Sequence, residues 1–236
     1  MFNVVIWGTV GQWIAAICTL TAVLVALFKD DYVRWRRRPI LRVTADLRSP
    51  HCAKALLGPI VVQRAAMTTL TAECYYLRLW IENVGKTRAE QVQVFLGRVF
   101  RATADAAFIE DTSYLPMNLR WSNSPPGMLP ETYADGVSPE MGKHCDLLRI
   151  VDPKMRRDVG DDLRDVPATS VVGALQLEVV PIMRTDLLGP GLYRLELRVA
   201  AANCGPVIAT LELNIVGTWH EDESAMFRNG IELRVI

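Results

Sequence analysis

Two histidines and two cysteines, residue types that bind zinc, could together form a metal site. They occur as two adjacent pairs, His51–Cys52 and His144–Cys145. Two thiolates and two imidazoles complete the tetrahedral coordination that Zn²⁺ prefers. Adjacent residues of an extended chain rarely both point at one ion, however, and the C-x-x-C and H-x-x-x-H spacings of zinc sites are absent. We therefore predict no metal site and interpret both pairs as loop histidines beside ordinary cysteines.

Two acidic segments could bind a cation or serve acid–base chemistry. The segment WHEDES around His220 lacks the second histidine of the H-E-x-x-H motif. Residues 156–165, RRDVGDDLRD, contain four aspartates but have neither the alternation nor the terminal glutamate of an EF-hand loop. Both segments are predicted to be solvated at the surface. No G-x-S-x-G, P-loop or G-x-G-x-x-G motif occurs, so we predict a non-enzyme without catalytic residues or cofactor.

The first element along the chain is an apolar segment. Residues 1–28 contain no charged side chain, and residues 4–28 would span about 37 Å as a helix, against a hydrocarbon core of about 30 Å. A cleaved secretory signal would need a basic start and a shorter apolar run. A core helix of a soluble domain is the other alternative, but uncharged runs of this length are rare there. The segment is therefore predicted to be a single transmembrane anchor.

A basic segment, residues 29–38, follows the anchor and predicts its orientation. Positively charged residues stay on the cytoplasmic side, and acidic neighbours count for little. We therefore expect an inner-membrane protein with its amino terminus outside and residues 39–236 in the cytosol. The predicted membrane-interface residues, which would contact lipid headgroups, are Lys29, Arg34, Trp35, Arg36, Arg37 and Arg38.

Overall charge and cysteine content agree with this placement. Basic and acidic residues number 26 each, so no global field favours a nucleic-acid partner, and tethering accounts for the RWRRR run. The five cysteines are odd in number and widely spaced, which is not typical of a disulfide framework and fits a reducing cytosol.

Small residues recur at four-residue spacing within the anchor. Gly11, Ala15 and Thr19 would line one stripe of a helix, and small residues allow two membrane helices to approach closely. This spacing predicts self-association of the anchor and hence a homo-oligomer.

Beyond the anchor, hydrophobic residues alternate with polar ones, which indicates half-buried antiparallel strands. The clearest case is PGLYRLELRVA, where Tyr193, Leu195, Leu197 and Val199 alternate with charged residues. The same periodicity predicts strands at 39–47, 75–83, 91–99, 174–180 and 208–216, with a possible last strand at 231–236. The fold class we predict is a mainly β protein, an antiparallel immunoglobulin-like β-sandwich preceded by one transmembrane helix.

Two segments resemble a known family. Residues 77–96, LRLWIENVGKTRAEQVQVFL, are similar to the strand, Asn-x-Gly turn and strand of bacterial immunoglobulin-like domains of the CARDB type, with Asn83 and Gly85 in the turn. Residues 189–206 resemble the late strands of such sandwiches, with Tyr193 placed like a tyrosine-corner residue. The resemblance implies a sandwich fold alone, since fold does not fix function.

Residues from about 100 to 170 lack clear strand periodicity and contain seven prolines between Pro116 and Pro167. We predict an irregular insertion in the 39–236 domain. Its aromatic residues would either pack onto the sandwich, which is the better interpretation, or form a contact surface of Tyr114, Trp121 and Tyr133.

Two functions fit these features. The first is a non-enzymatic cytosolic β-sandwich, held at the inner membrane, that recognises a protein partner or a small ligand. The alternative is a membrane effector of a bacterial antiviral, abortive-infection-type system, whose transmembrane helix oligomerises and disrupts the membrane when triggered. Exchanging the anchor for an unrelated apolar helix discriminates between them.

Overall fold

The computed structural model describes residues 4–63, 67–122 and 132–236. The chain divides between Arg38 and Pro39 into two compact units. The first unit is helix α1 (Val4–Arg37), and the described residues contain one segment, Val10–Asp30, that is long and apolar enough to cross a membrane. The helix continues through the basic segment as far as Arg37. It stops before Pro39, which disfavours helical geometry in the residue that precedes it.

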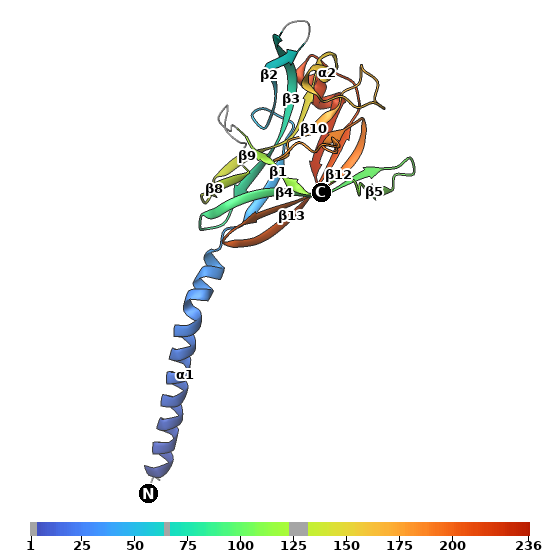
Figure 1. Cartoon of the computed structure of the whole chain (residues 1–236). Coiled ribbons are helices and arrows are strands. Elements are labelled where there is room, and N and C mark those ends of the chain that lie inside the picture. The colour runs from blue at the N-terminus through green and yellow to red at the C-terminus, as the bar shows by residue number, and fades with distance from the viewer. Residues whose placement is uncertain (1–3, 64–66, 123–131) are drawn as a thin grey trace. The chain divides into compact units, whose positions relative to one another are not determined.

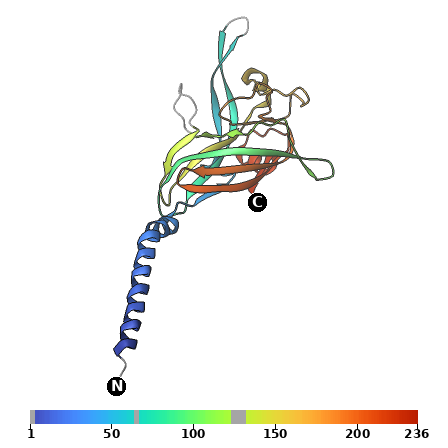
Figure 2. The same cartoon turned by 60° about the horizontal axis from the view of Figure 1, so that its bottom comes forward.

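The second unit contains two antiparallel sheets (Figures 1 and 2). In the described chain the first sheet has seven strands, with β1–β3–β9–β10–β11 in order and with β2 beside β3 and β7 beside β9. Their bounds are β1 (Leu41–Ala45), β2 (Cys52–Gln63), β3 (Met67–Asn83), β7 (Arg120–Trp121), β9 (Gly142–Val151), β10 (Gly173–Leu175) and β11 (Leu187–Leu188).

The second sheet also has seven strands in the described residues, in the order β14–β13–β12–β4–β5, with β6 and β8 paired to β4. Their bounds are β4 (Ala89–Ala102), β5 (Phe108–Glu110), β6 (Met117–Asn118), β8 (Tyr133–Val137), β12 (Gly191–Ala201), β13 (Cys204–Ile215) and β14 (Ile231–Val235). Short helical turns lie outside the sheets, namely η1 (Pro153–Met155), α2 (Arg156–Val159), α3 (Glu223–Ala225) and η2 (Met226–Gly230).

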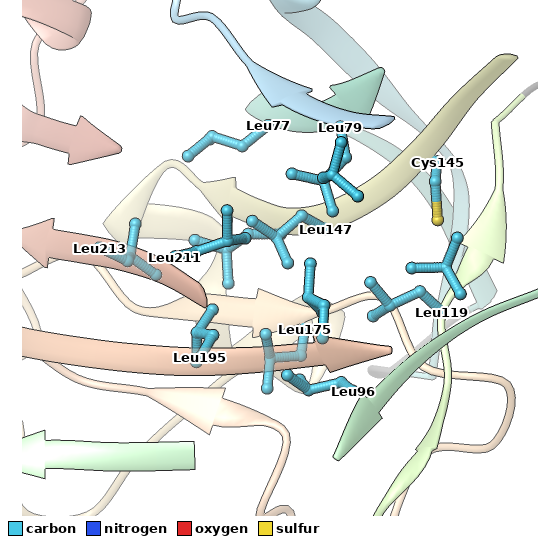
Figure 3. Close-up of a cluster of buried hydrophobic side chains, with 14 of the residues drawn as sticks. Leu77, Leu79, Leu96, Leu119, Cys145, Leu147, Leu175, Leu195, Leu211 and Leu213 are labelled. Carbon is cyan, nitrogen blue, oxygen red and sulfur yellow. The ribbon is translucent and has the colours of Figure 1, made fainter. Parts of the chain in front are cut away.

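One hydrophobic core joins the two sheets. Leu77 and Leu79 of β3 belong to the same buried cluster as Leu195 of β12 and Leu211 and Leu213 of β13 (Figure 3). All five side chains are inaccessible to solvent. Burying one such side chain contributes about 2 kcal/mol to the free energy of folding. The alternation in the sequence therefore predicted the inward-facing residues of these strands correctly.

The stretch expected to be an irregular insertion carries strands β5 to β9, and β9 lies inside the first sheet between β3 and β10. A bulge explains why the sequence did not indicate β9. The pairing passes from Leu77↔Leu148 to Arg78↔Asp146, so Leu147 has no opposite residue. Leu147 and Leu148 are consequently both buried, and the period-two pattern is interrupted.

The strand predicted at 174–180 is shorter than expected. β10 ends at Leu175, and beyond it only Leu177 forms an isolated bridge, with Leu119. Val179, expected to be buried, is largely exposed. The backbone N–H of Leu177 donates to the carbonyl oxygen of Leu175 at 3.1 Å instead of to a neighbouring strand, which interrupts the ladder after Leu175.

Tyr193 makes the hydrogen bond expected of it. Its hydroxyl is buried and donates to the carbonyl oxygen of Gly189 at 2.9 Å. We expect Tyr193→Phe to lower the free energy of unfolding by about 1 kcal/mol, the usual net contribution of one such bond. Urea titration of the detergent-solubilised full chain measures this change. An unaltered midpoint would show that the hydroxyl contributes nothing to stability.

Candidate functional site

The first sheet turns one face to the core, and its other face carries polar side chains. Arg78 of β3 pairs in register with Asp146 of β9, and their side chains form an ion pair at 3.0 Å. Successive residues of a strand point to opposite faces, so this pair lies opposite the face of Leu77 and Leu79. The outer face of β3 and β9 is therefore where charged side chains gather.

The segment after β9 covers part of this outer face. Met155 of η1 and Val159 of α2 pack against a small buried cluster that includes Cys74 of β3 and Val151 of β9. The chain next passes through Gly160, whose positive φ of 77° ends α2. This packing brings the following residue, Asp161, onto the sheet.

A cleft of about 130 Å³ opens at this position. Three arginines from different parts of the chain line it: Arg120 of β7, Arg149 of β9, and Arg184 from the loop between β10 and β11. Asp161 and Asp186 also line it. We call these five residues, together with the further lining residues Gln176 and Val180, the arginine cleft.

The two aspartates hold two of the arginines in place. Arg149 Nη2 lies 2.6 Å from Asp161 Oδ2, and Arg184 Nη2 lies 3.2 Å from the other oxygen of that carboxylate. Arg184 also donates to both oxygens of Asp186, each at 3.1 Å. The two carboxylates are only 3% and 4% exposed, so these contacts are weakly screened by solvent.

The charges in the cleft shift the pKa values of its arginines. Burial lowers the pKa of Arg149, but Asp161 and Tyr76 together raise it and the net shift is upward. Burial likewise lowers the pKa of Arg184, and Asp186 and Asp161 raise it above its ordinary value. All three guanidinium groups remain charged, since arginine does not deprotonate in proteins.

Arg120 differs from the other two arginines because it forms no ion pair in the described part of the chain. Its Nε donates to the carbonyl oxygen of Leu177, and its Nη2 lies 3.5 Å from that of Glu178. Burial, and then the neighbouring Arg149 guanidinium, lower the pKa of Arg120. The charge of Asp146 opposes this lowering. Its carboxylate, however, accepts hydrogen bonds from Arg78 at 3.0 Å and from Ser122 at 2.5 Å and is not paired with Arg120.

The two histidines considered for zinc come together on the outer face of the same sheet. His144 Nε2 lies 2.9 Å from His51 Nδ1, so one ring donates a hydrogen bond to the other. The ring of Trp80 packs against both. His144 lies within β9, so its predicted placement in a loop was wrong.

The cysteines beside these histidines lie in the core. Cys52 and Cys145 are fully buried members of the main hydrophobic cluster, on the opposite side of the strands from the imidazoles. Burial raises the pKa of Cys52 to about 11 and that of Cys145 well above its ordinary value. The four side chains therefore do not converge, and the described residues contain no group of three or more potential metal ligands.

His144 makes stability depend on pH. Burial lowers its pKa, His51 and Arg78 lower it further, and Asp146 opposes them. Between the lowered folded pKa and the ordinary value of 6.5, the unfolded chain binds more protons than the folded chain. This contribution to stability is thus complete above about pH 6.5 and is lost as the pH falls toward the folded pKa.

We expect His144→Gln to reduce this loss, because glutamine does not titrate. Urea midpoints of the full chain measured from about pH 8 down to about pH 5 test the expectation. Near pH 8 the urea midpoint should change with pH equally in the variant and the unmodified protein. Below pH 6.5 the midpoint of the unmodified protein should fall more steeply. Parallel curves over the whole range would contradict it.

Two of the three aromatic residues considered for a contact surface pack into the core instead, which was the preferred interpretation. Tyr114 is 6% and Trp121 1% exposed, and both belong to the main core cluster. Trp121 is buried because β7 turns it inward beside Cys145, and its Nε1 donates to the carbonyl oxygen of Thr132 at 3.1 Å. The side chain of Tyr133 lies outside the described part of the structure.

The residues predicted to contact the membrane lie in α1, except Arg38, which directly follows it. The side chains of Arg34 and Trp35 lie outside the described part, while Lys29, Arg36, Arg37 and Arg38 are exposed. In the stripe expected to drive self-association, Gly11, Ala15 and Thr19 are exposed along one continuous helix. Thr19 Oγ1 donates to the carbonyl oxygen of Ala15 at 2.8 Å, so its single proton is used within its own helix.

The sequence did not indicate the arginine cleft. Residues 156–165 were predicted to be a solvated turn, yet Arg156 and Asp161 within them are 1% and 2% exposed. The available signal was an arginine inside an apolar run, Arg149 in DLLRIV. Buried arginines require acidic partners, and the nearest aspartate-rich segment along the chain is the one that supplies Asp161.

By its fold the chain is an antiparallel two-sheet β protein with an N-terminal apolar helix, and its β unit carries the arginine cleft. Comparison with known proteins gives no match among family models, curated proteins or solved structures.

Proposed function

We propose that the chain is a non-enzymatic single-pass protein of the inner membrane, which presents its β unit to the cytosol as an interaction or sensing module. The observation that carries the proposal is the exposure of α1. Trp13 is 72% and Leu27 65% exposed, and no residue of Val10–Asp30 is buried. An apolar helical segment of 21 residues is stable in lipid, whereas in water its exposed apolar surface would promote aggregation.

The orientation in this proposal rests on charge. Lys29 and the arginines up to Arg42 flank the carboxyl end of the apolar segment, whereas residues 1–3 on its other flank carry no charged side chain. By the positive-inside rule the β unit faces the cytosol. Each basic side chain near an anionic leaflet contributes about 1 kcal/mol of attraction.

The finer description of the β unit as an immunoglobulin-like sandwich of the CARDB type belongs to the same proposal. The hydrogen bond from Tyr193 to Gly189 supports it, because a tyrosine near the start of a late strand makes such a bond in these sandwiches. The turn at Asn83 and Gly85 supports it as well.

The test of the proposal is a reporter that is active only in the cytosol, fused after Ile236. We expect activity, because the basic flank retains the carboxyl end inside. A matched fusion of a reporter active only outside the cytosol should be inactive. The opposite result for the two fusions would overturn the orientation and with it the cytosolic module.

The small-residue stripe of α1 favours the second candidate function, a membrane effector whose helix oligomerises. A Cβ added at Gly11 would meet no atom within 4 Å, so Gly11→Leu with Ala15→Leu fits a single helix and obstructs only a second one. Crosslinking in membranes should lose oligomers in this variant and retain them in Ala16→Leu, which lies off the stripe. If expression of the protein arrests growth and this arrest disappears together with the oligomers, the effector function replaces the interaction module as the proposed function.

A further inference from the structure

We propose that the arginine cleft binds a small oxyanion, namely a phosphate ion or the phosphoryl group of a larger ligand. The proposal deepens the sensing role proposed above, on which its biological meaning rests, and names the class of ligand that the β unit would recognise. The physical argument concerns this unit alone and does not depend on the orientation of α1.

The first argument is the charge balance of the cleft. Its lining residues include three guanidinium groups and two carboxylates, a difference of one positive charge. Asp161 and Asp186 account for Arg149 and Arg184 through close ion pairs, and the excess charge is that of Arg120. A half-buried guanidinium without a carboxylate partner favours an anion beside it.

The second argument is a surplus of hydrogen-bond donors. The Nε of Arg149 is buried and has no hydrogen-bond partner. Arg120 makes one close bond through its Nε, to Leu177, and its Nη2 contact with Glu178 is long at 3.5 Å. Each guanidinium offers five N–H donors in a planar fork. Because buried donors normally find acceptors, a group with several acceptor oxygens satisfies this cleft better than a cation or a neutral ligand.

The third argument is the rigidity of the arginines. Arg184 is held by both oxygens of Asp186 and by Asp161, and its Nη1 donates to the carbonyl oxygen of Gly160. Arg149 is fixed by Asp161. Side chains that are already ordered lose little entropy on binding, and planar arginine forks suit phosphate geometry.

The size of the cleft limits the ligand. At about 130 Å³ it is smaller than the roughly 300 Å³ at which pockets begin to enclose drug-sized molecules. It therefore fits one oxyanion group and leaves the remainder of any larger ligand outside. A whole nucleotide would not be enclosed.

The rim of the cleft is apolar on one side. Val180, which lines the cleft, belongs to a loop in which Val179, Val180, Ile182 and Met183 are exposed, Ile182 to 99%. The phosphoryl group could accordingly come from a soluble ion or from a phospholipid headgroup whose acyl chains contact this loop. Both sources present the same oxyanion to Arg120.

The test is a calorimetric titration of the full chain in non-ionic detergent micelles with inorganic phosphate, at constant ionic strength against chloride. We expect saturable binding that Arg120→Gln weakens about tenfold or more, since hydrogen bonds to charged groups are strong. Arg120→Lys keeps the charge without the fork and should bind with intermediate affinity. Arg164→Gln removes the same charge from an exposed position in the loop after α2 and should bind as the unmodified protein does.

Absence of saturable binding, or equal affinity in Arg120→Gln and Arg164→Gln, would overturn the proposal. Circular dichroism of each variant confirms that it is folded. Dioctanoyl phosphatidic acid, titrated in the same way, separates the two sources. Tighter binding than inorganic phosphate, reduced by Ile182→Ser, assigns the site to a lipid headgroup, and equal or weaker binding assigns it to a free phosphate. Because these measurements do not involve topology, their failure leaves the reporter result standing.

Discussion

Asn83→Ala is expected to lower the free energy of unfolding by about 3 kcal/mol, because four backbone groups would lose their hydrogen-bond partner, a fully buried side chain. Asn83 is 0% exposed. Its Oδ1 accepts from the backbone N–H groups of Ile40 at 3.2 Å and Gly85 at 3.0 Å. Its Nδ2 donates to the carbonyl oxygens of Thr87 at 2.7 Å and Val137 at 2.9 Å.

The effect should be large because Asn83 joins separate parts of the fold. Ile40 precedes β1, Gly85 and Thr87 form the turn between β3 and β4, and Val137 ends β8. Asn83 therefore fixes the entry into one sheet against a strand of the other.

Asn203→Ala is the matched control for Asn83→Ala. Asn203 also bonds two backbone groups, the carbonyl oxygen of Arg88 at 2.8 Å and the N–H of Glu90 at 3.1 Å. It is exposed, so water can replace it, and the loss should stay below about 1 kcal/mol. Urea titration of both full-length variants, followed by circular dichroism of the strands, provides the comparison. Equal losses would mean that burial of Asn83 adds nothing to its hydrogen bonds.

The outcome for individual strands shows what the sequence can predict here. β12 and β13 pair residue by residue from Gly191↔Ile215 to Val199↔Val207, and an unbroken ladder preserves the period-two pattern that the sequence displays. β2 and β9 were missed because their ladders are interrupted. The register of β2 shifts between Leu57 and Ile60, and that of β9 shifts at Leu147, so inward and outward positions no longer alternate.

The arginine cleft was beyond prediction for a different reason. Arg120, Arg149 and Arg184 are about 30 residues apart along the chain, and a bulged strand, a two-residue strand and a loop bring them together. Local periodicity carries no information on such contacts. The aspartates of 156–165 were visible in the sequence, but an acidic segment is typical of a solvated turn unless its partner is known. The packing of Val159 of α2 against the cluster that includes Cys74 and Val151 places Asp161 beside Arg149.

Asp161→Asn is expected to lower the free energy of unfolding by about 3 kcal/mol, since removing one member of a buried charge network leaves the others uncompensated. Asp161 pairs with Arg149 at 2.6 Å and with Arg184 at 3.2 Å, and its carboxylate is 3% exposed. Asparagine keeps the shape but not the charge. Asp165→Asn, at an exposed position four residues away, removes the same charge and should change stability by less than about 0.5 kcal/mol.

The same variant links stability to the proposed oxyanion. Without the Asp161 carboxylate the cleft carries one more uncompensated positive charge, so phosphate should bind more tightly and raise the urea midpoint more than in the unmodified protein. The increase in the free energy of unfolding should grow with the logarithm of the phosphate concentration once the site is filled, as for any ligand that binds only the folded state. Chloride at equal ionic strength should not reproduce it. If phosphate instead stabilises Asp161→Asn and Asp165→Asn equally, its effect is not exerted through the arginine cleft.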